Sequence, residues 1–350
     1  MDNIQEFLRP VYGHQNLFHQ FLGSLNKQSL HHAWLLSGPQ GIGKSYSAYA
    51  LARFLLRHPK EPYPTMLPKE EMDRIFHQVQ NGTHPDFFLL QKGEDTLSHS
   101  KTFITVDAIR HVTQKLQQTS VYGGWKVVLV DAVDDMNEKA QNAFLKTLEE
   151  PTACTVFFLI HHGIGSLAPT LRSRCHEIKM PPLSSTDMEA FLKENPVPLT
   201  KQEIDCAEAI SEGRLGIFEQ LVHFQGLALL DQIIEALLEV LTRRNPPYPK
   251  SFHLSEFIGK EEETQESLFY YLITWYLQTI TRRLATQDRT PLAGTREEQN
   301  PLPWPILSLE SWLQAQEEAL KILKEGSALK TELKQRILSC FSALNTDRYA

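Results

Sequence analysis

The sequence predicts an α/β domain with a parallel sheet over residues 1–180, followed by a wholly helical remainder. Three observations carry this prediction. Short apolar runs alternate with amphipathic helical patterns through the first half of the chain. Two of those runs, Val127–Val130 and Thr155–Ile160, are apolar without interruption, as strands buried on both faces require. After Pro181 and Pro182 the strand-like runs stop and helical periodicity takes over.

The elements of the α/β domain follow one another in a regular order. The apolar runs that we interpret as strands are Ala33–Leu36, Asp86–Leu90, Phe103–Val106, Val127–Val130 and Thr155–Ile160, and we expect one more strand over Cys175–Met180. Helical stripes lie between them, and the stripe that ends at Leu116 has Asp107 as its expected N-cap. The next stripe stops at Pro151, because proline lacks the amide hydrogen that a helix interior needs.

The remainder of the chain is predicted to contain helices only. Two short helices, over Thr186–Glu194 and Thr200–Ile210, precede a stop signal at Gly213. Longer helical patterns follow. The segment Ser267–Leu277 is apolar nearly all round, so we expect it to be buried between other helices. A last helical run extends from about Leu309 to Leu344 and closes the chain.

Composition limits the class of protein. The chain has 350 residues, of which 41% are hydrophobic and 22% charged, as in ordinary globular proteins of two or three domains. Its net charge of −7 argues against a protein that coats nucleic acid by itself. The four cysteines lie far apart, which favours a reducing cytosol over a disulfide framework. An acidic N-terminus and the lack of a long apolar run predict a cytoplasmic chain without a membrane span.

One motif indicates a binding function. The segment 38–45 reads GPQGIGKS and matches GxxxxGK[ST] in full, with a buried strand before it and a helix after it. Its glycines let backbone N–H groups curl around phosphates, Lys44 would reach the β- and γ-phosphates, and the Ser45 hydroxyl would bind Mg²⁺. The residues expected to hold ATP with Mg²⁺ are Gly38, Pro39, Gly41, Gly43, Lys44, Ser45 and Asp131. A loop that folds but no longer binds nucleotide remains an alternative.

The second strand of such a site ends at Asp131, which would hold Mg²⁺ through water. Phosphate-loop proteins that hydrolyse ATP usually place a glutamate directly after this aspartate, but Ala132 follows here. Asp134 and Asp135 come shortly afterwards, and we interpret them as negative charges at a helix N-terminus. The sequence therefore supports nucleotide binding and gives no support to hydrolysis by this chain alone.

Several segments carry a family resemblance: Asn142–Pro151, Ser173–Cys175, Leu30–Gly38, His84–Asp86 and Val130–Asn137. The first two resemble the AAA+ subunits of the bacterial replicative clamp loader. The other three narrow the resemblance to the family of delta-prime subunits of DNA polymerase III. The resemblance is strong over about residues 8–183 and rests on size and helical character beyond them.

The resemblance implies a role for Arg174 and a division into domains. Arg174 matches the arginine finger that such subunits offer to a neighbour's γ-phosphate, and it is the expected catalytic residue. The implied domains are an AAA+ nucleotide-binding domain (1–180), a small helical lid (181–213) and a helical collar for oligomerisation (214–350). The implied partners are other clamp-loader subunits in a hetero-pentamer, the sliding clamp, and primed DNA through the assembled complex.

The sequence also departs from the family. No cysteine lies within 57–81, where relatives often carry a zinc module, so we predict no zinc. The proline-rich stretch 57–72 is interpreted as a surface insertion. His161 and His162 stand where ATP-hydrolysing subunits place a small hydroxyl residue. The alternative function is an autonomous AAA+ ATPase that hydrolyses ATP at its own site, and Ala132 is the feature against it.

Overall fold

The computed structural model of the chain describes residues 11–58, 63, 73–93, 103–163, 167–242, 249–258, 263–303, 308–328 and 331–345. The chain divides into two compact units. Unit 1 comprises Met1–Asn195 and Gly213–Gly216, and unit 2 comprises Pro196–Glu212 and Ile217–Ala350. The finer division into nucleotide-binding domain, lid and collar stays a prediction. The predicted insertion over 57–72 falls mostly outside the described residues.

Unit 1 is built on a five-stranded sheet in which every neighbouring pair is parallel. Its elements are α1 (Gln15–Asn26), β1 (Ala33–Ser37), α2 (Lys44–Arg57), α3 (Arg74–Gln80), β2 (Phe87–Gln91), α4 (Val106–Leu116), β3 (Lys126–Asp131), the 3-10 helix η2 (Val133–Asp135), α5 (Glu138–Glu149), β4 (Thr155–His161), α6 (Pro169–Arg172), β5 (His176–Lys179) and α7 (Ser185–Glu194). The strand order is β2-β3-β4-β1-β5. The predicted α/β fold with a parallel sheet is thereby confirmed.

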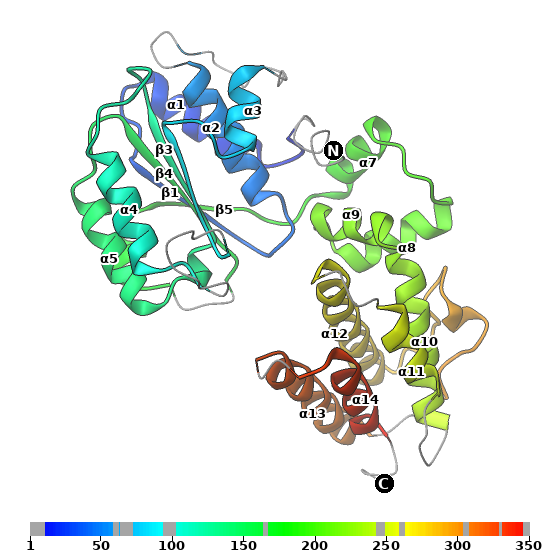
Figure 1. Ribbon diagram of the computed structural model, residues 1–350. Helices are drawn as coiled ribbons and strands as arrows, with labels where there is room; N and C mark the ends of the chain where they lie inside the picture. Colours follow the sequence, from blue (N-terminus) through cyan, green and yellow to red (C-terminus); the bar gives the residue numbers. More distant parts are fainter. Residues whose placement is uncertain are drawn as a thin grey trace. The chain divides into compact units, whose positions relative to one another are not determined.

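Helices cover both faces of this sheet, α1 to α3 on one side and α4 with α5 on the other (Figure 1). Side chains of a strand point alternately to the two faces. In β1, Trp34 and Leu36 join the core under α1 and α2, whereas Ala33 and Leu35 join the core under α4 and α5. Burial on both faces is the reason why the central strands read as uninterrupted apolar runs.

One predicted strand is wrong. The run 103–106 contributes a single bridge, between Ile104 and Met136, and α4 begins directly after it. The predicted cap is wrong as well, because the N-cap of α4 is Thr105, whose side chain accepts the backbone N–H of the third helical residue. Asp107 instead lies in the first turn, where its charge complements the helix dipole.

In the part of unit 2 that the structure describes, the regular secondary structure is all helical and loops connect the helices. Its elements are α8 (Lys201–Ser211), α9 (Leu215–His223, whose first two residues belong to unit 1), α10 (Gly226–Thr242), α11 (Pro249–Phe257), α12 (Glu263–Thr286), the 3-10 helix η3 (Arg296–Glu298), α13 (Leu309–Ala328) and α14 (Leu333–Ala343). The single run predicted from Leu309 to Leu344 is therefore two helices. They pack against each other, which one continuous helix cannot do.

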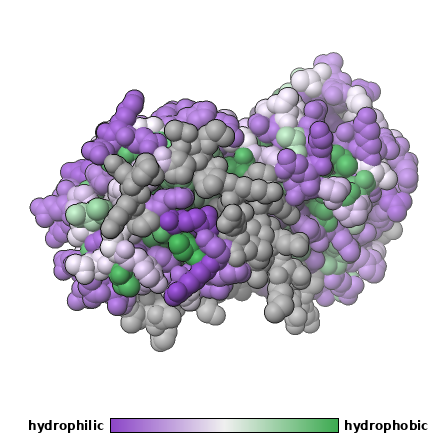
Figure 2. Space-filling view, turned by 90° about the horizontal axis from the view of Figure 1, so that it is seen from above, coloured by the Kyte–Doolittle hydropathy of each residue, from purple (hydrophilic) through white to green (hydrophobic). Residues whose placement is uncertain are grey.

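The predicted burial of Ser267–Leu277 is confirmed, since α12 packs against α10 and α13 and buries most of its apolar side chains. Arg283 of the same helix forms an ion pair with Glu297 of η3; their charged atoms are 2.6 Å apart, and the side chains are 9% and 1% exposed. Within the described ranges no single helix has the length and hydropathy to cross a membrane; the bent pair α9 and α10 passes only when both are taken together. The face drawn in Figure 2 is mainly hydrophilic, with small separate apolar patches.

We expect Phe157→Ala to destabilise the sheet of unit 1 by about 3–5 kcal/mol. Phe157 lies fully buried in β4 and packs edge-on against Phe144, so its loss leaves a cavity on the face covered by α5. Hydrogen exchange of the sheet amides in the full chain measures the effect. The matched control is Phe103→Ala, because the Phe103 side chain is 50% exposed and should change stability by less than about 0.5 kcal/mol. Equal protection in the two variants would contradict this assignment of the core.

Candidate nucleotide-binding site

The phosphate loop joins the end of β1 to the first turn of α2. Gly41 and Gly43 have φ of 84° and 92°, a conformation that favours glycine. At Gly38 a Cβ would lie 2.3 Å from the carbonyl oxygen of Met180, so the close passage of two backbones excludes a side chain there. Gly43 is the N-cap of α2, and the free N–H groups of the first helical turn therefore border the loop. This geometry is that of an anion-binding loop.

Lys44, the first residue of α2, ends this loop and is only 3% exposed. Its Nζ donates to the carbonyl oxygens of Gly38 and Pro39 at 2.7 and 2.5 Å. Burial lowers the pKa of Lys44 to about 8, against the opposing influence of the negative charges of Asp131 and Asp134. A buried ammonium that is held mainly by neutral carbonyls is poised to bind an anion, because a phosphate would supply the charge that these partners lack.

Ser45 and Asp131 meet beside the lysine. The Ser45 hydroxyl donates to Asp131 Oδ2 at 2.7 Å, which joins the start of α2 to the end of β3. Burial raises the pKa of Asp131, while the Ser45 hydrogen bond and the charge of Lys44 act in the opposite direction. A hydroxyl and a carboxylate oxygen suit Mg²⁺, which takes few protein ligands and keeps its remaining positions for water and phosphate. The donor set therefore fits the metal that the sequence predicts.

The position after Asp131 holds no group for activating water, since Ala132 has an apolar side chain and is 2% exposed. Asp134 and Asp135 lie in η2 and not at the N-terminus of α5, whose N-cap is Asn137. Both carboxylates lie in the first turn of η2, so our interpretation of them as helix N-terminal charges holds for this short 3-10 helix and not for α5. Asp135 lies 3.9 Å from the ammonium of Lys92.

Asp134 instead organises the end of β4. Its Oδ2 accepts the backbone N–H of His162 at 2.7 Å, and its Oδ1 lies 3.1 Å from Nδ1 of His161. The backbone of His161 in turn accepts the N–H of Gly38, the first residue of the loop. Burial, followed by the charge of Lys44, lowers the pKa of His162 to about 4, so this ring is neutral at physiological pH. The two histidines thus border the loop as part of one polar cluster.

A short segment, Gly213–Gly216, which we call the glycine strap, also contacts the loop. The N–H of Gly216, at the start of α9, donates to the carbonyl oxygen of Gly41 at 2.7 Å. A Cβ at Gly216 would lie 3.2 Å from both the Cα and the carbonyl oxygen of Gly41, so this approach leaves little room for a side chain. The strap is anchored by Gly213, whose carbonyl oxygen accepts the N–H of Leu183.

Arg174 lies at the other end of the sheet. It precedes β5, whereas the loop follows β1, and these two strands are parallel neighbours with Trp34 opposite His176 and Ser37 opposite Lys179. Four residues of strand separate the two ends by about 13 Å. The Arg174 side chain is 35% exposed, and its Nη1 donates to the carbonyl oxygen of Thr170. The structure therefore brings six of the predicted site residues together with Asp131 and leaves Arg174 apart from them.

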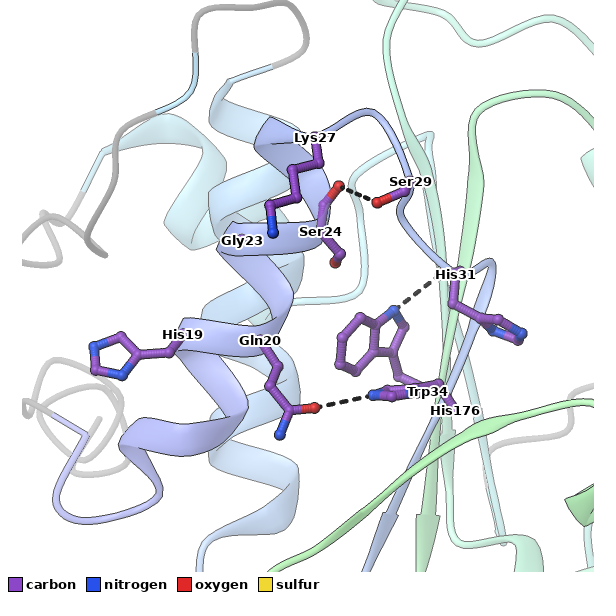
Figure 3. A pocket seen from close by; sticks show the side chains of 9 residues that line it. All are labelled: His19, Gln20, Gly23, Ser24, Lys27, Ser29, His31, Trp34 and His176. Carbon is purple, nitrogen blue, oxygen red and sulfur yellow. Dashed lines mark hydrogen bonds between the residues drawn. The ribbon is translucent and has the colours of Figure 1, made fainter.

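A surface cavity of about 470 Å³ lies away from the loop. Its lining residues are His19, Gln20, Gly23, Ser24, Lys27, Ser29, His31, Trp34 and His176 (Figure 3). Trp34 donates its ring N–H to the carbonyl oxygen of His31, and His176 lies within hydrogen-bond distance of Gln20. None of these residues belongs to the segment 38–45, so this cavity is separate from the candidate nucleotide site.

Comparison with known proteins places the chain in a family. A family model described as "DNA polymerase III, delta subunit" matches residues 13–184. The chain is 32% identical to DNA polymerase III subunit delta' of Bacillus subtilis over 281 residues, which cover 76% of this chain and 77% of that protein. The chain belongs to the delta-prime family of DNA polymerase III subunits. It is also 29% identical to the delta' subunit of Pseudomonas aeruginosa over 328 residues, which cover 89% of this chain and 92% of that protein.

A third relative, the delta' subunit of Escherichia coli, is 38% identical over 169 residues, which is 47% of each chain. The chain thus spans about half the length of this relative and most of the length of the other two. The region matched by the family model contains the loop, Asp131 and Arg174. The resemblance that the sequence motifs indicate is confirmed.

Sequence reasoning missed Asp134 and Gly216 as parts of the site. The signal for Asp134 was a carboxylate three residues after Asp131, but the number of residues alone does not tell whether it faces the loop or a helix end. The only signal near Gly216 was Gly213, the glycine predicted to end a helix three residues earlier. Only the folded chain brings Gly216, at the start of α9, against the loop.

We expect Lys44→Ala to abolish ATP binding by the isolated chain, because it removes the buried cation whose Nζ contacts the loop carbonyls. Isothermal titration calorimetry with ATP and Mg²⁺ measures the effect. The matched control is Lys27→Ala, an exposed lysine that lines the separate cavity and should leave binding unchanged. If the unaltered chain binds no ATP, the loop has lost this activity.

We expect ATP affinity to fall as the pH rises above about 8. The pKa of Lys44 is lowered to about 8, so the free site loses its ammonium charge above that pH. A bound phosphate raises this pKa, and binding then requires uptake of a proton, which weakens affinity by up to tenfold per pH unit. Calorimetry in buffers of different ionisation heat detects the proton. Constant affinity from pH 7 to pH 9.5 would contradict the assignment.

Proposed function

We propose that this chain is a clamp-loader subunit of the replicative DNA polymerase III holoenzyme, a part of the cytoplasmic machinery of DNA replication. It binds ATP at its own phosphate loop, supplies Arg174 to the ATP site of a neighbouring subunit, and helps to load the sliding clamp onto primed DNA. Membership of the delta-prime family supports the assembly, and the position of Arg174 supports the role within it.

The observation that carries the proposal is the separation of Arg174 from its own loop. A guanidinium at the opposite end of β1 and β5 cannot serve the nucleotide of its own chain, yet it is charged and partly exposed. An arginine finger acts in this way, because it enters a neighbour's site and stabilises the charge of the transferring phosphoryl group. Arginine suits the role better than lysine, since its planar fork of donors matches phosphate oxygens.

At its own loop the chain would bind ATP without hydrolysing it unaided. Ser45 and Asp131 would hold Mg²⁺, which neutralises phosphate charge, and Lys44 would contact the phosphates. The buried Ala132 leaves the usual place of the water-activating carboxylate apolar.

The helical remainder would provide the contacts within the assembly. We propose that residues 181–213 form a lid and residues 214–350 a collar that joins the other subunits into a hetero-pentamer. A net charge of −7 suits a subunit that does not hold DNA alone, because in a ring the contacts to phosphates are shared among several chains.

ATP turnover distinguishes this function from that of an autonomous ATPase. The purified chain should show no turnover above background, whereas the reconstituted complex with primed DNA should hydrolyse ATP. Brisk turnover by the chain alone, unaffected by Ala132→Glu, would overturn the proposal in favour of the autonomous enzyme. Failure to assemble with other clamp-loader subunits would overturn it as well.

We expect Arg174→Ala to slow ATP turnover by the complex by a factor on the order of 10³ or more, as the loss of an arginine finger does. The chain should still fold and assemble, because the Arg174 side chain is partly exposed. The matched control is Arg172→Ala. Arg172 is engaged by both oxygens of Glu177 and should leave the neighbour's site intact. Unchanged turnover in Arg174→Ala would show that this arginine is structural.

A further inference from the structure

Two of the segments that carry the family resemblance meet in space. Glu149 is the last residue of α5, in the segment Asn142–Pro151, and Arg174 belongs to the segment Ser173–Cys175. Arg174 Nη2 lies 2.5 Å from Glu149 Oε1, and Arg174 Nη1 donates to the carbonyl oxygen of Thr170 at 2.8 Å. The guanidinium is therefore held at two points by its own chain.

The pair of Arg174 and Glu149 has fewer contacts than the neighbouring pair of Arg172 and Glu177. Arg172 is bound by both carboxylate oxygens of Glu177, and Glu177 also accepts the Ser37 hydroxyl, so that arginine belongs to a closed intrachain network. The next residue after Glu149 is Glu150, an exposed side chain for which no partner is found among the described residues. Of two adjacent carboxylates at the end of α5, only Glu149 contacts Arg174.

The two contacts leave the guanidinium able to act. Arginine has five N–H donors, and Glu149 and Thr170 engage one nitrogen each, so donors remain for a phosphate. The side chains of Arg174 and Glu149 are 35% and 46% exposed, and an ion pair at such a surface is too weak to withhold the arginine from a polyphosphate. A free arginine, by contrast, must lose the freedom of a long side chain when it docks.

We propose that Glu149 is a positioning residue for Arg174: it orients the guanidinium before the neighbouring subunit's ATP arrives. The inference rests on the proposed function of Arg174 as an arginine finger. Because Glu149 acts through the arginine and not on the phosphate, its removal affects the rate at which bound ATP reacts and not the affinity for ATP.

Steady-state ATP turnover by the reconstituted complex tests this role. Glu149→Ala should lower kcat about two- to fivefold with KM for ATP unchanged, as expected for the loss of an exposed ion pair. Glu149→Gln, which keeps an oxygen acceptor, should retain more of the rate than Glu149→Ala. Glu150→Ala is the matched control and should have the kcat of the unaltered complex.

A double-variant cycle separates positioning from a merely structural effect. In an Arg174→Ala background, Glu149→Ala should have no further effect on kcat, because the residue through which it acts is gone. The same fold-loss in both backgrounds, a rise in kcat, or no change at all in Glu149→Ala would overturn the proposal. If Arg174→Ala itself has no effect, the arginine-finger function fails and this inference falls with it; if only Glu149→Ala is silent, the function stands and the inference alone is rejected.

Discussion

The parallel direction of the five strands is the constraint on which the rest of unit 1 depends. Because the strands are parallel, all their carboxyl ends lie at one edge of the sheet and all their amino ends at the other. The loop after β1, Asp131 at the end of β3 and His161 at the end of β4 therefore converge, although they are far apart in the sequence. The same constraint sends the residue before β5 to the opposite edge. One chain thus carries the phosphate loop at one edge and Arg174 at the other, as the proposed function requires.

Because these strand ends meet, the charges of Lys44, Asp131 and Asp134 lie close together, and both carboxylates affect the ionisation of Lys44. Lys44 and Asp131 are both shifted toward their neutral forms by burial, and each favours the charged form of the other. Asp134 adds a second negative charge near the lysine and holds the end of β4 through His161 and His162. The loop carbonyls accept hydrogen bonds from the ammonium of Lys44, but they carry no full charge, which is why we propose a phosphate as its further partner.

Patterns over a few consecutive residues predicted those parts of the fold that depend on the residues of one segment alone. The sequence predicted β1, β3 and β4 because strands buried on both faces need apolar residues at nearly every position. It predicted the GxxxxGK[ST] loop because the backbone conformation there requires glycine at fixed positions. The strand predicted over 103–106 was wrong because an apolar segment does not show whether a partner strand is available, and only one bridge forms. Thr105 and Asp107 are both acceptable caps by type, and the choice between them depended on where the helix axis begins.

By itself the sequence determined the α/β fold, the phosphate loop, the missing carboxylate at Ala132 and the family to which the chain belongs. Each of these follows from residue types at fixed spacing, which a linear chain displays directly. The tertiary structure decided that Asp134 faces the histidines, that Gly216 closes on Gly41, and that Glu149 holds Arg174. These contacts join residues 25 or more positions apart, and their partners are selected by strand order and helix packing, which spacing along the chain does not encode.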